Sequence, residues 1–473
     1  MNLHKTPTFA IIGHPNEGKS SVLSTLAEDD SVRISPFPGE TKKCRKFPVV
    51  IDGREIICFI DTPGFQNPRK SLQWMQNYQG ADKDLLTDYL AAHQDMASFR
   101  DDCALLAPVA EGAGVIFVVD GSRPLRHADR AEMEILRLSG APRMAVINSK
   151  EDDSSFLEQW QTAFRKHFNS IRKFNSTRAT YVQRIDLLES LKYIDQQWEP
   201  ALKKTVEAFK IDWQARNESV AELMLSLLAE VLSYTKTVSC SREKEETCRQ
   251  QLWQQFKNFA EKKEQGTHKA IRRLFKHNIF SLELPSQSLL HEDLFSSKTW
   301  EFLGLTGRQV ILAGAVSGAA VGAGLDVAAA GITFGVFSSI GGLVGGLATA
   351  IKGRKWLTDM RIMGIRLGGD QLVIGPVTNI QLMYVLLDRT FLFYRHTINW
   401  AHGKREYPDG PLPLAEGNGK ESFSASWSRD EHKVCELFFQ GIRQKNENKA
   451  QEQAQAAMRS FLKAKLLQIS TDG

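Results

Sequence analysis

The stretch that decides the fold is Phe9-Ala10-Ile11-Ile12-Gly13-His14-Pro15-Asn16-Glu17-Gly18-Lys19-Ser20. Four apolar residues, typical of a buried strand, lead directly into a loop of the form G-x-x-x-x-G-K-[ST]. A helical pattern begins just after the loop with Ser21, Val22 and Leu23. A glycine-rich loop between a strand and a helix turns its backbone N–H groups inward, where they can surround an anionic phosphate. The stretch therefore predicts a phosphate-binding α/β domain.

Further apolar runs extend the strand pattern, at residues 47–51, 56–60, 115–119 and 144–147. The first two flank Asp52-Gly53, which is a strong hairpin signal. The last two are continuously apolar, as expected for strands buried on both faces. Such strands separated by helical patterns predict a doubly wound, mostly parallel sheet. Residues 66–111 form a long polar insertion that we expect to be helical, with Trp74 and Tyr78 as packing anchors.

Two more motifs place chemistry around this loop. Asp61-Thr62-Pro63-Gly64 ends the run at 56–60, where Asp61 is expected to hold Mg²⁺ through water and the Gly64 N–H to contact a γ-phosphate. Pro38-Gly39-Glu40-Thr41 lies between the two motifs, and Thr41 is the candidate for a mobile-loop threonine that closes on Mg²⁺ and the γ-phosphate. Within the loop itself, Lys19 is expected to reach the outer phosphates and the Ser20 hydroxyl to coordinate Mg²⁺. The predicted catalytic residues are Lys19, Thr41 and Gly64, and the predicted Mg²⁺ ligands are Ser20, Thr41 and Asp61.

The order G-x-P-N-x-G-K-S, P-G-x-T and D-T-P-G resembles the Era/TrmE branch of the translation-factor-related GTPases, over roughly the first 180 residues. The resemblance implies that the ligand is GTP, that Mg²⁺ is the cofactor and that the protein hydrolyses GTP slowly. In that family [NT]KxD after a strand carries base specificity. Here the chain reads Asn148-Ser149-Lys150-Glu151-Asp152-Asp153, and aligning Lys150 with Asp152 gives S-K-x-D, with Asp153 as the alternative carboxylate. This departure leaves the preference for GTP over ATP open.

The last family motif, an S-A dipeptide, has its best match at Asn175-Ser176-Thr177. The nucleotide-binding residues implied by all these motifs are Gly13, Asn16, Glu17, Gly18, Lys19, Ser20, Ser21, Asn148, Lys150, Asp152 and Ser176. Asn16 matches the loop asparagine that helps to hold K⁺ in this branch, and a loop-stabilising hydrogen bond is the alternative role. Phe65 stands where Ras-like enzymes carry a water-orienting glutamine. The resemblance thus implies a GTPase stimulated by K⁺ or by pairing of two GTPase domains in a homodimer.

The remainder of the chain is helical in character apart from residues 309–351, where Asp326 is the only charged residue and ten glycines occur. Glycines recur there at four-residue spacing, the pattern of a glycine zipper, which lets two helices approach closely. We expect a helical hairpin, either inserted in a membrane, where it would contact lipid or a membrane protein, or buried within the protein. The predicted domains are a GTPase domain (1–185), a helical domain (186–308), the glycine-rich hairpin (309–351) and a C-terminal helical region (352–473), so that the C-terminal part is all-α.

The net charge of +5 over 473 residues argues against a nucleic-acid partner. The six scattered cysteines indicate reduced thiols, and the polar N-terminus is no signal peptide, so we expect a cytoplasmic protein, associated with the inner face of the cytoplasmic membrane if the hairpin inserts. The whole layout resembles bacterial GTPases with a C-terminal DUF3482 domain. The leading hypothesis is a membrane-associated GTPase switch or remodeller. The alternatives are a soluble regulatory GTPase in ribosome or RNA metabolism and a nucleotide-binding scaffold that does not hydrolyse GTP.

Overall fold

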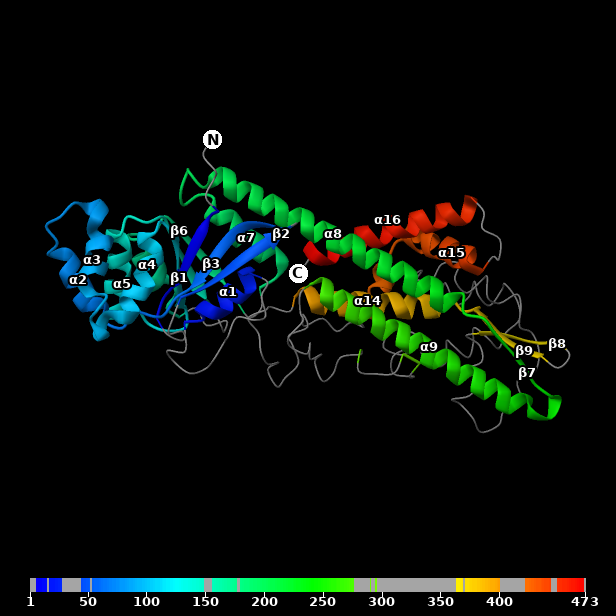
Figure 1. Cartoon of the computed structure of the whole chain (residues 1–473). Helices are drawn as coiled ribbons and strands as arrows, with labels where there is room; N and C mark the ends of the chain where they lie inside the picture. The colour runs from blue at the N-terminus through cyan, green and yellow to red at the C-terminus, as the bar shows by residue number, and fades with distance from the viewer. Residues whose placement is uncertain are drawn as a thin grey trace.

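The structure is a computed structural model, and it describes residues 6–14, 17–27, 44–51, 53–148, 155–176, 179–275, 290, 294–295, 363–368, 371–399, 422–443 and 449–471. These residues form an elongated molecule (Figure 1). An α/β part occupies one end and long helices occupy the other.

The α/β part is built on a six-stranded sheet of order β2-β3-β1-β4-β5-β6. Its strands are β1 (Thr8–Ile12), β2 (Arg45–Ile51), β3 (Arg54–Asp61), β4 (Gly114–Asp120), β5 (Arg143–Asn148) and β6 (Ser170–Phe174). All neighbouring strands are parallel except the β2–β3 hairpin. The expected doubly wound, mostly parallel sheet is therefore confirmed.

Helices cover both faces of this sheet because successive side chains of a strand point to opposite sides. Phe9 and Ile11 of β1 enter the core that contains α1 (Lys19–Ala27) and α7 (Tyr181–Leu191). Ala10 and Ile12 enter the core on the other face. That second core is formed with α2 (Pro68–Gln76), α3 (Leu85–His93), α4 (Arg100–Ala110), α5 (His127–Leu138) and α6 (Leu157–Phe164).

The insertion at residues 66–111 is helical, as expected, and contains α2, α3 and α4 together with the short 3₁₀ helices η1 (Asp82–Asp84) and η2 (Ala97–Phe99). Trp74 holds these elements together through ring contacts with Tyr78, Tyr89 and His93, at centroid distances of 5.5, 5.5 and 5.3 Å. The insertion thus forms a cap of short helices at the outer end of the α/β part (Figure 1).

One long helix, α8 (Glu199–Leu232), connects the two ends of the molecule (Figure 1). At about 1.5 Å per residue it is roughly 50 Å long. Near its start, Leu202, Val206 and Phe209 belong to the core of the sheet. Further along, Val220 and Leu228 belong to the core of the C-terminal helices. A single continuous helix is therefore part of both cores.

The C-terminal part consists mainly of α8, α9 (Glu245–Leu274), α14 (Gln381–Ile398), α15 (Arg429–Arg443) and α16 (Lys449–Thr471), with the 3₁₀ helices η3 (Arg242–Lys244) and η5 (Ser424–Ser426). The expected helical character is confirmed, but the all-α expectation needs one correction. An antiparallel sheet of order β7-β9-β8 is present, formed by β7 (Lys236–Ser239), β8 (Met363–Gly368) and β9 (Gln371–Val377). β7 has only four residues and pairs with a strand that is distant in sequence, so no local sequence pattern predicts it.

The predicted domain boundary and the predicted state of the cysteines can be compared with the structure. The boundary between residues 185 and 186 falls inside α7. The expectation of reduced thiols is wrong for one pair, because Cys240 and Cys248 form a disulfide. The turn of η3 lies between these two cysteines and brings their Cα atoms to 6.5 Å.

The glycine-rich hairpin expected at 309–351 lies outside the described residues. Among the helices that the structure does describe, none combines the length and the apolar composition needed to cross a membrane.

Candidate nucleotide-binding site

The P-loop, residues 13–20, connects the end of β1 to the start of α1. Gly13 has φ +150°, and a Cβ at this position would lie 2.2 Å from the carbonyl oxygen of Val118 in β4. Gly18 has φ +88°, in the region that favours glycine. Both glycines of the motif are therefore required by the backbone path, the first for close approach to β4 and the second for its torsion angle.

Lys19 turns back over the loop from the first position of α1. Its Nζ donates to the carbonyl oxygens of Gly13 and His14 at 2.9 and 3.1 Å. Burial lowers the pKa of this ammonium group, while the negative charges of Asp61, Glu132 and Glu17 act in the opposite direction. The ammonium group is thus held at the loop itself, where a phosphate cradled by the loop would meet it.

Ser20 and Asp61 come together from different elements. The Ser20 Oγ lies 3.5 Å from the Asp61 Oδ2, and the parallel register of β1 and β3 places Ile11 beside Asp61. The Thr62 Oγ1 also donates to the Ile11 carbonyl at 2.7 Å and fixes the start of the D-T-P-G turn. A hydroxyl and a carboxylate form an all-oxygen donor set, which is the type that Mg²⁺ prefers. These two residues therefore fit the predicted metal site.

Asn148, the last residue of β5, links three parts of the site. Its Nδ2 donates to the Glu17 carbonyl at 3.2 Å, and its Oδ1 accepts hydrogen bonds from the Ser176 backbone N–H and hydroxyl at 3.1 and 3.0 Å. The Ser176 carbonyl in turn accepts from the Thr25 hydroxyl of α1 at 3.1 Å. The structure thus brings Asn148 and Ser176 to the P-loop although they are far apart in sequence.

The other predicted site residues divide into two groups. Ser21 is buried in α1, and Gly64 lies buried after the end of β3. Asn16, Thr41, Lys150 and Asp152 lie outside the described residues. Phe65, which follows the D-T-P-G motif, is 2% exposed and belongs to the core beneath the helical insertion.

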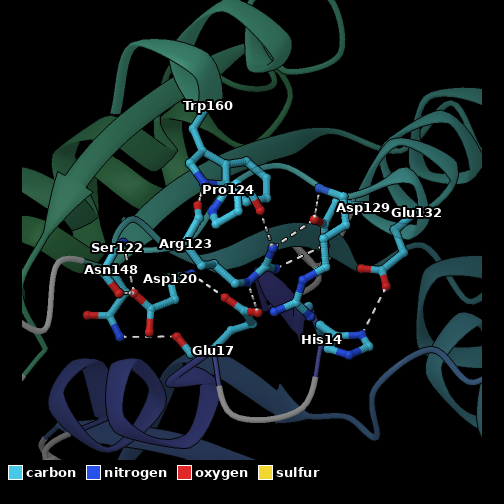
Figure 2. A network of polar contacts seen from close by, with 12 residues as sticks. His14, Glu17, Asp120, Ser122, Arg123, Pro124, Asp129, Glu132, Asn148 and Trp160 are labelled. Carbon is cyan, nitrogen blue, oxygen red and sulfur yellow. Dashed lines mark hydrogen bonds and ion pairs between the residues drawn. The ribbon is translucent and has the colours of Figure 1, made fainter. Parts of the chain in front are cut away.

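Sequence reasoning missed a network of charged residues beside the P-loop (Figure 2). Arg123 follows β4 and forms ion pairs with Glu17 of the P-loop and with Asp129 of α5. No motif marks Arg123. Arg123 lies just beyond the carboxyl end of a central parallel strand, which is where ligands bind in such sheets. This position could have indicated a role for Arg123 at the site.

A second contact joins the P-loop to α5. The His14 Nδ1 lies 3.5 Å from the Glu132 Oε1, and Figure 2 shows the imidazole pointing toward that carboxyl group. Glu132 is fully buried, and burial raises the pKa of its carboxyl group. The first residues of the P-loop are therefore held against α5 as well as against β4.

Two family models match this chain. Residues 8–149 match a family described as "50S ribosome-binding GTPase", and residues 161–467 match a family described as "Domain of unknown function (DUF3482)". Among curated proteins, GTPase Der of Erwinia tasmaniensis is 28% identical over 157 residues, which cover 33% of this chain and 26% of Der. GTPase Der of Agathobacter rectalis is 39% identical over 72 residues, covering 15% of this chain and 16% of that protein.

The chain thus spans about a quarter of the length of the first of these relatives. Among solved structures, Era in complex with MgGDPNP and a segment of 16S ribosomal RNA is 22% identical, with a TM-score of 0.29, covering 40% of this chain and 57% of that chain. An S. thermophilus NFeoB variant bound to GDP.AlF4- is 16% identical, with a TM-score of 0.23, covering 57% of this chain and 90% of that chain. The DUF3482 match covers more than half of the chain, and we conclude that this protein belongs to the DUF3482 family and carries a P-loop GTPase domain at its N-terminal side.

Proposed function

We propose that this protein binds GTP and hydrolyses it to GDP and phosphate, acting as a molecular switch. The observation that carries the proposal is the convergence of Lys19, the Ser20–Asp61 pair and the Asn148–Ser176 link at the P-loop. In this mechanism the backbone N–H groups of the loop and the Lys19 ammonium hold the phosphates. Ser20 and Asp61 are the residues that would hold Mg²⁺, and the ion would supply positive charge that neutralises the phosphates. Thr41 and the Gly64 N–H are proposed to contact the γ-phosphate.

Asn148 also suggests how the base-specificity motif is aligned. In [NT]KxD the carboxylate stands three residues after the asparagine or threonine. Asn148 is the residue whose amide joins the P-loop to Ser176, and counting from it gives N-S-K-E, with Glu151 as the carboxylate. We propose this register in preference to S-K-x-D, in which Asp152 has that role. Either carboxylate accepts hydrogen bonds from guanine N1 and N2, so GTP is the proposed ligand in both.

The switch needs a route from the nucleotide to the C-terminal domain, and we propose that α8 is this route. The Thr205 hydroxyl of α8 donates to the Ile56 carbonyl of β3 at 3.0 Å. β3 ends at Asp61, so the helix is anchored on a strand that carries a nucleotide motif. Because α8 is continuous into the C-terminal core, a displacement at this strand would move both ends of the helix together.

Hydrolysis is tested by following phosphate release from GTP with the full chain and with Lys19→Ala. We expect slow release from the wild-type protein and none from the variant. If the wild-type protein binds GTP but releases phosphate no faster than Lys19→Ala, the protein is the non-hydrolysing scaffold instead.

We propose further that K⁺ stimulates this reaction through Asn16, since a cation beside the phosphates supplies the positive charge that an arginine supplies in other GTPases. The same assay in KCl and in NaCl measures this effect. Equal rates in the two salts would exclude it. Light scattering with GDP and a phosphate analogue shows whether two GTPase domains pair in a homodimer.

For the C-terminal side, we propose that residues 309–351 bring the switch to a membrane, on the basis of their apolar, glycine-rich composition. Co-sedimentation with anionic lipid vesicles, with and without a GTP analogue, tests this proposal. Binding in either state supports membrane association. Absence of binding in both states would favour the alternative of a soluble regulatory GTPase.

A further inference from the structure

The charged network beside the P-loop is centred on Arg123, and we call Glu17, Asp120, Arg123, Asp129 and Trp160 the Arg123 network (Figure 2). All three guanidinium nitrogens of Arg123 are engaged. The Nε donates to the Glu17 Oε1, while Nη1 and Nη2 donate to the two oxygens of Asp129 at 2.7 and 2.9 Å. This two-pronged contact requires the planar fork of arginine, which lysine lacks.

Trp160 of α6 fixes the position of this arginine from a second direction. The guanidinium carbon lies 5.0 Å from the centre of the indole ring, and the indole N–H donates to the Arg123 carbonyl at 2.8 Å. Figure 2 shows the tryptophan reaching down to the arginine from the side opposite Glu17. Arg123 is only 13% exposed, so its orientation is set by the protein and not by solvent.

Glu17 is the point where this network reaches the P-loop. Its side chain is 4% exposed and uses both oxygens, one for Arg123 and the other for the backbone N–H of Asp120 at the end of β4. Its own carbonyl accepts the hydrogen bond from Asn148 at the end of β5. One loop residue is thus attached to two neighbouring strands at once.

The charges of the network explain why Arg123 is needed. Glu17 is a buried carboxylate in a loop that has to accept polyphosphate, and burial raises the pKa of Glu17 while Arg123 lowers it. Asp129, 1% exposed, adds a second buried carboxylate and also accepts from the Arg126 backbone N–H at the start of α5, at 2.7 Å. Without Arg123, two buried carboxylates beside the P-loop would lose their ion-pair partner.

We propose that Arg123 and Glu17 are positioning residues for the P-loop, which hold it in its phosphate-binding geometry by joining it to β4, α5 and α6. The inference rests on the proposed nucleotide binding of this site. Neither side chain needs to touch the reacting atoms. The expected consequence is a change in nucleotide affinity, and therefore in KM, with kcat nearly unchanged.

The test is the dissociation constant of a fluorescent GDP, measured with the full chain and with Glu17→Ala, Glu17→Gln and Arg123→Gln. Glu17→Ala removes the contact with Asp120 and Arg123 but leaves the Arg123–Asp129 pair intact. Loss of such charge-assisted hydrogen bonds should weaken GDP binding by about 10- to 100-fold. Glu17→Gln keeps one acceptor oxygen and should recover part of this loss. Arg123→Gln should weaken binding at least as much as Glu17→Ala, and the double variant Glu17→Gln/Arg123→Gln should bind more tightly than Arg123→Gln alone.

Arg137→Gln is the matched control, because Arg137 forms a similar forked pair with Glu134 of the same helix but is 45% exposed. It should bind GDP as the wild-type protein does. Folding of each variant is checked by its thermal unfolding. If Arg123→Gln does not fold, the two Glu17 variants decide.

If folded Glu17→Ala binds GDP as tightly as the wild-type protein, the inference is wrong. If affinity falls only in proportion to lost thermal stability and Glu17→Gln recovers nothing, the role is structural and the inference is also wrong. Failure of the wild-type protein and of Arg137→Gln to bind GDP at all would instead refute the proposed function.

Discussion

The coupling of the two ends of the molecule through α8 can be tested at Trp213. This side chain is 5% exposed and lies where α7, α8 and the C-terminal core meet. Its ring stacks on Tyr181 of α7 at 3.8 Å and contacts the edge of Phe275, after α9, at 5.0 Å. Replacement by alanine removes these contacts and leaves a cavity at the joint.

The size of the effect follows from general values for buried aromatic residues. Truncation of such a residue to alanine costs about 3–5 kcal/mol. GDP at about 100 times its dissociation constant stabilises the part of the protein to which it binds by about 2.7 kcal/mol. In the wild-type protein we expect one unfolding transition, which GDP shifts to higher temperature. In Trp213→Ala we expect two transitions, with GDP raising only that of the α/β part.

Calorimetry and hydrogen exchange of α14 and α16, each with and without GDP, measure this behaviour. Phe438→Ala is the matched control, because Phe438 is a buried aromatic residue of α15 in the same C-terminal core, and α15 lies well along the molecule from α7 (Figure 1). It should lower stability by a similar amount and retain the coupling. A single transition that still responds to GDP in Trp213→Ala would refute the idea that this joint transmits the nucleotide state.

Three further predictions concern other parts of the chain. Burial raises the pKa of Asp388 to about 6, so on raising the pH this carboxyl group ionises in the unfolded chain before it ionises in the folded protein. The free energy of unfolding therefore falls as the pH rises from about 4 to about 6. Between pH 5 and pH 7 the wild-type protein should lose about 1 kcal/mol relative to Asp388→Asn, as measured by urea unfolding. The Arg389–Glu264 pair is buried and forked, with distances of 2.6 and 3.1 Å, so Arg389→Met should cost about 3–5 kcal/mol, whereas Arg389→Met/Glu264→Met should recover most of this loss in the same experiment. Glu151→Gln should weaken GTP binding about 10- to 100-fold and improve binding of XTP, because the new amide donates to the C2 carbonyl of xanthine. Asp152→Asn should change neither affinity. Both are measured in a competition assay, and the reverse result would support the S-K-x-D register.

The sequence predicted much of the α/β part because its signals are local. The P-loop motif needs glycine at fixed backbone positions, and Gly18 has the torsion angle that favours it. The alternation of Phe9 and Ile11 with Ala10 and Ile12 already divides β1 between two cores. Such features depend on residues within one contiguous segment, so they can be read without knowledge of the rest of the fold.

The C-terminal sheet could not be predicted in the same way. β7 pairs with β9, more than 130 positions along the chain. Pairing between such distant segments is decided by which strand edges the fold brings together, and a four-residue run such as Lys236–Ser239 has no periodicity long enough to indicate it.

By itself, the sequence determined the strand, glycine loop and helix of the nucleotide site, together with the Asp61 motif that faces them. Only the tertiary structure decided what holds that loop in place. Glu17 and Arg123 are 106 positions apart, and Asn148 is 131 positions from Glu17. These side chains meet because the carboxyl ends of parallel strands lie at one edge of the sheet. The sequence around a loop glutamate or around an arginine after a strand does not indicate which distant residue it will contact.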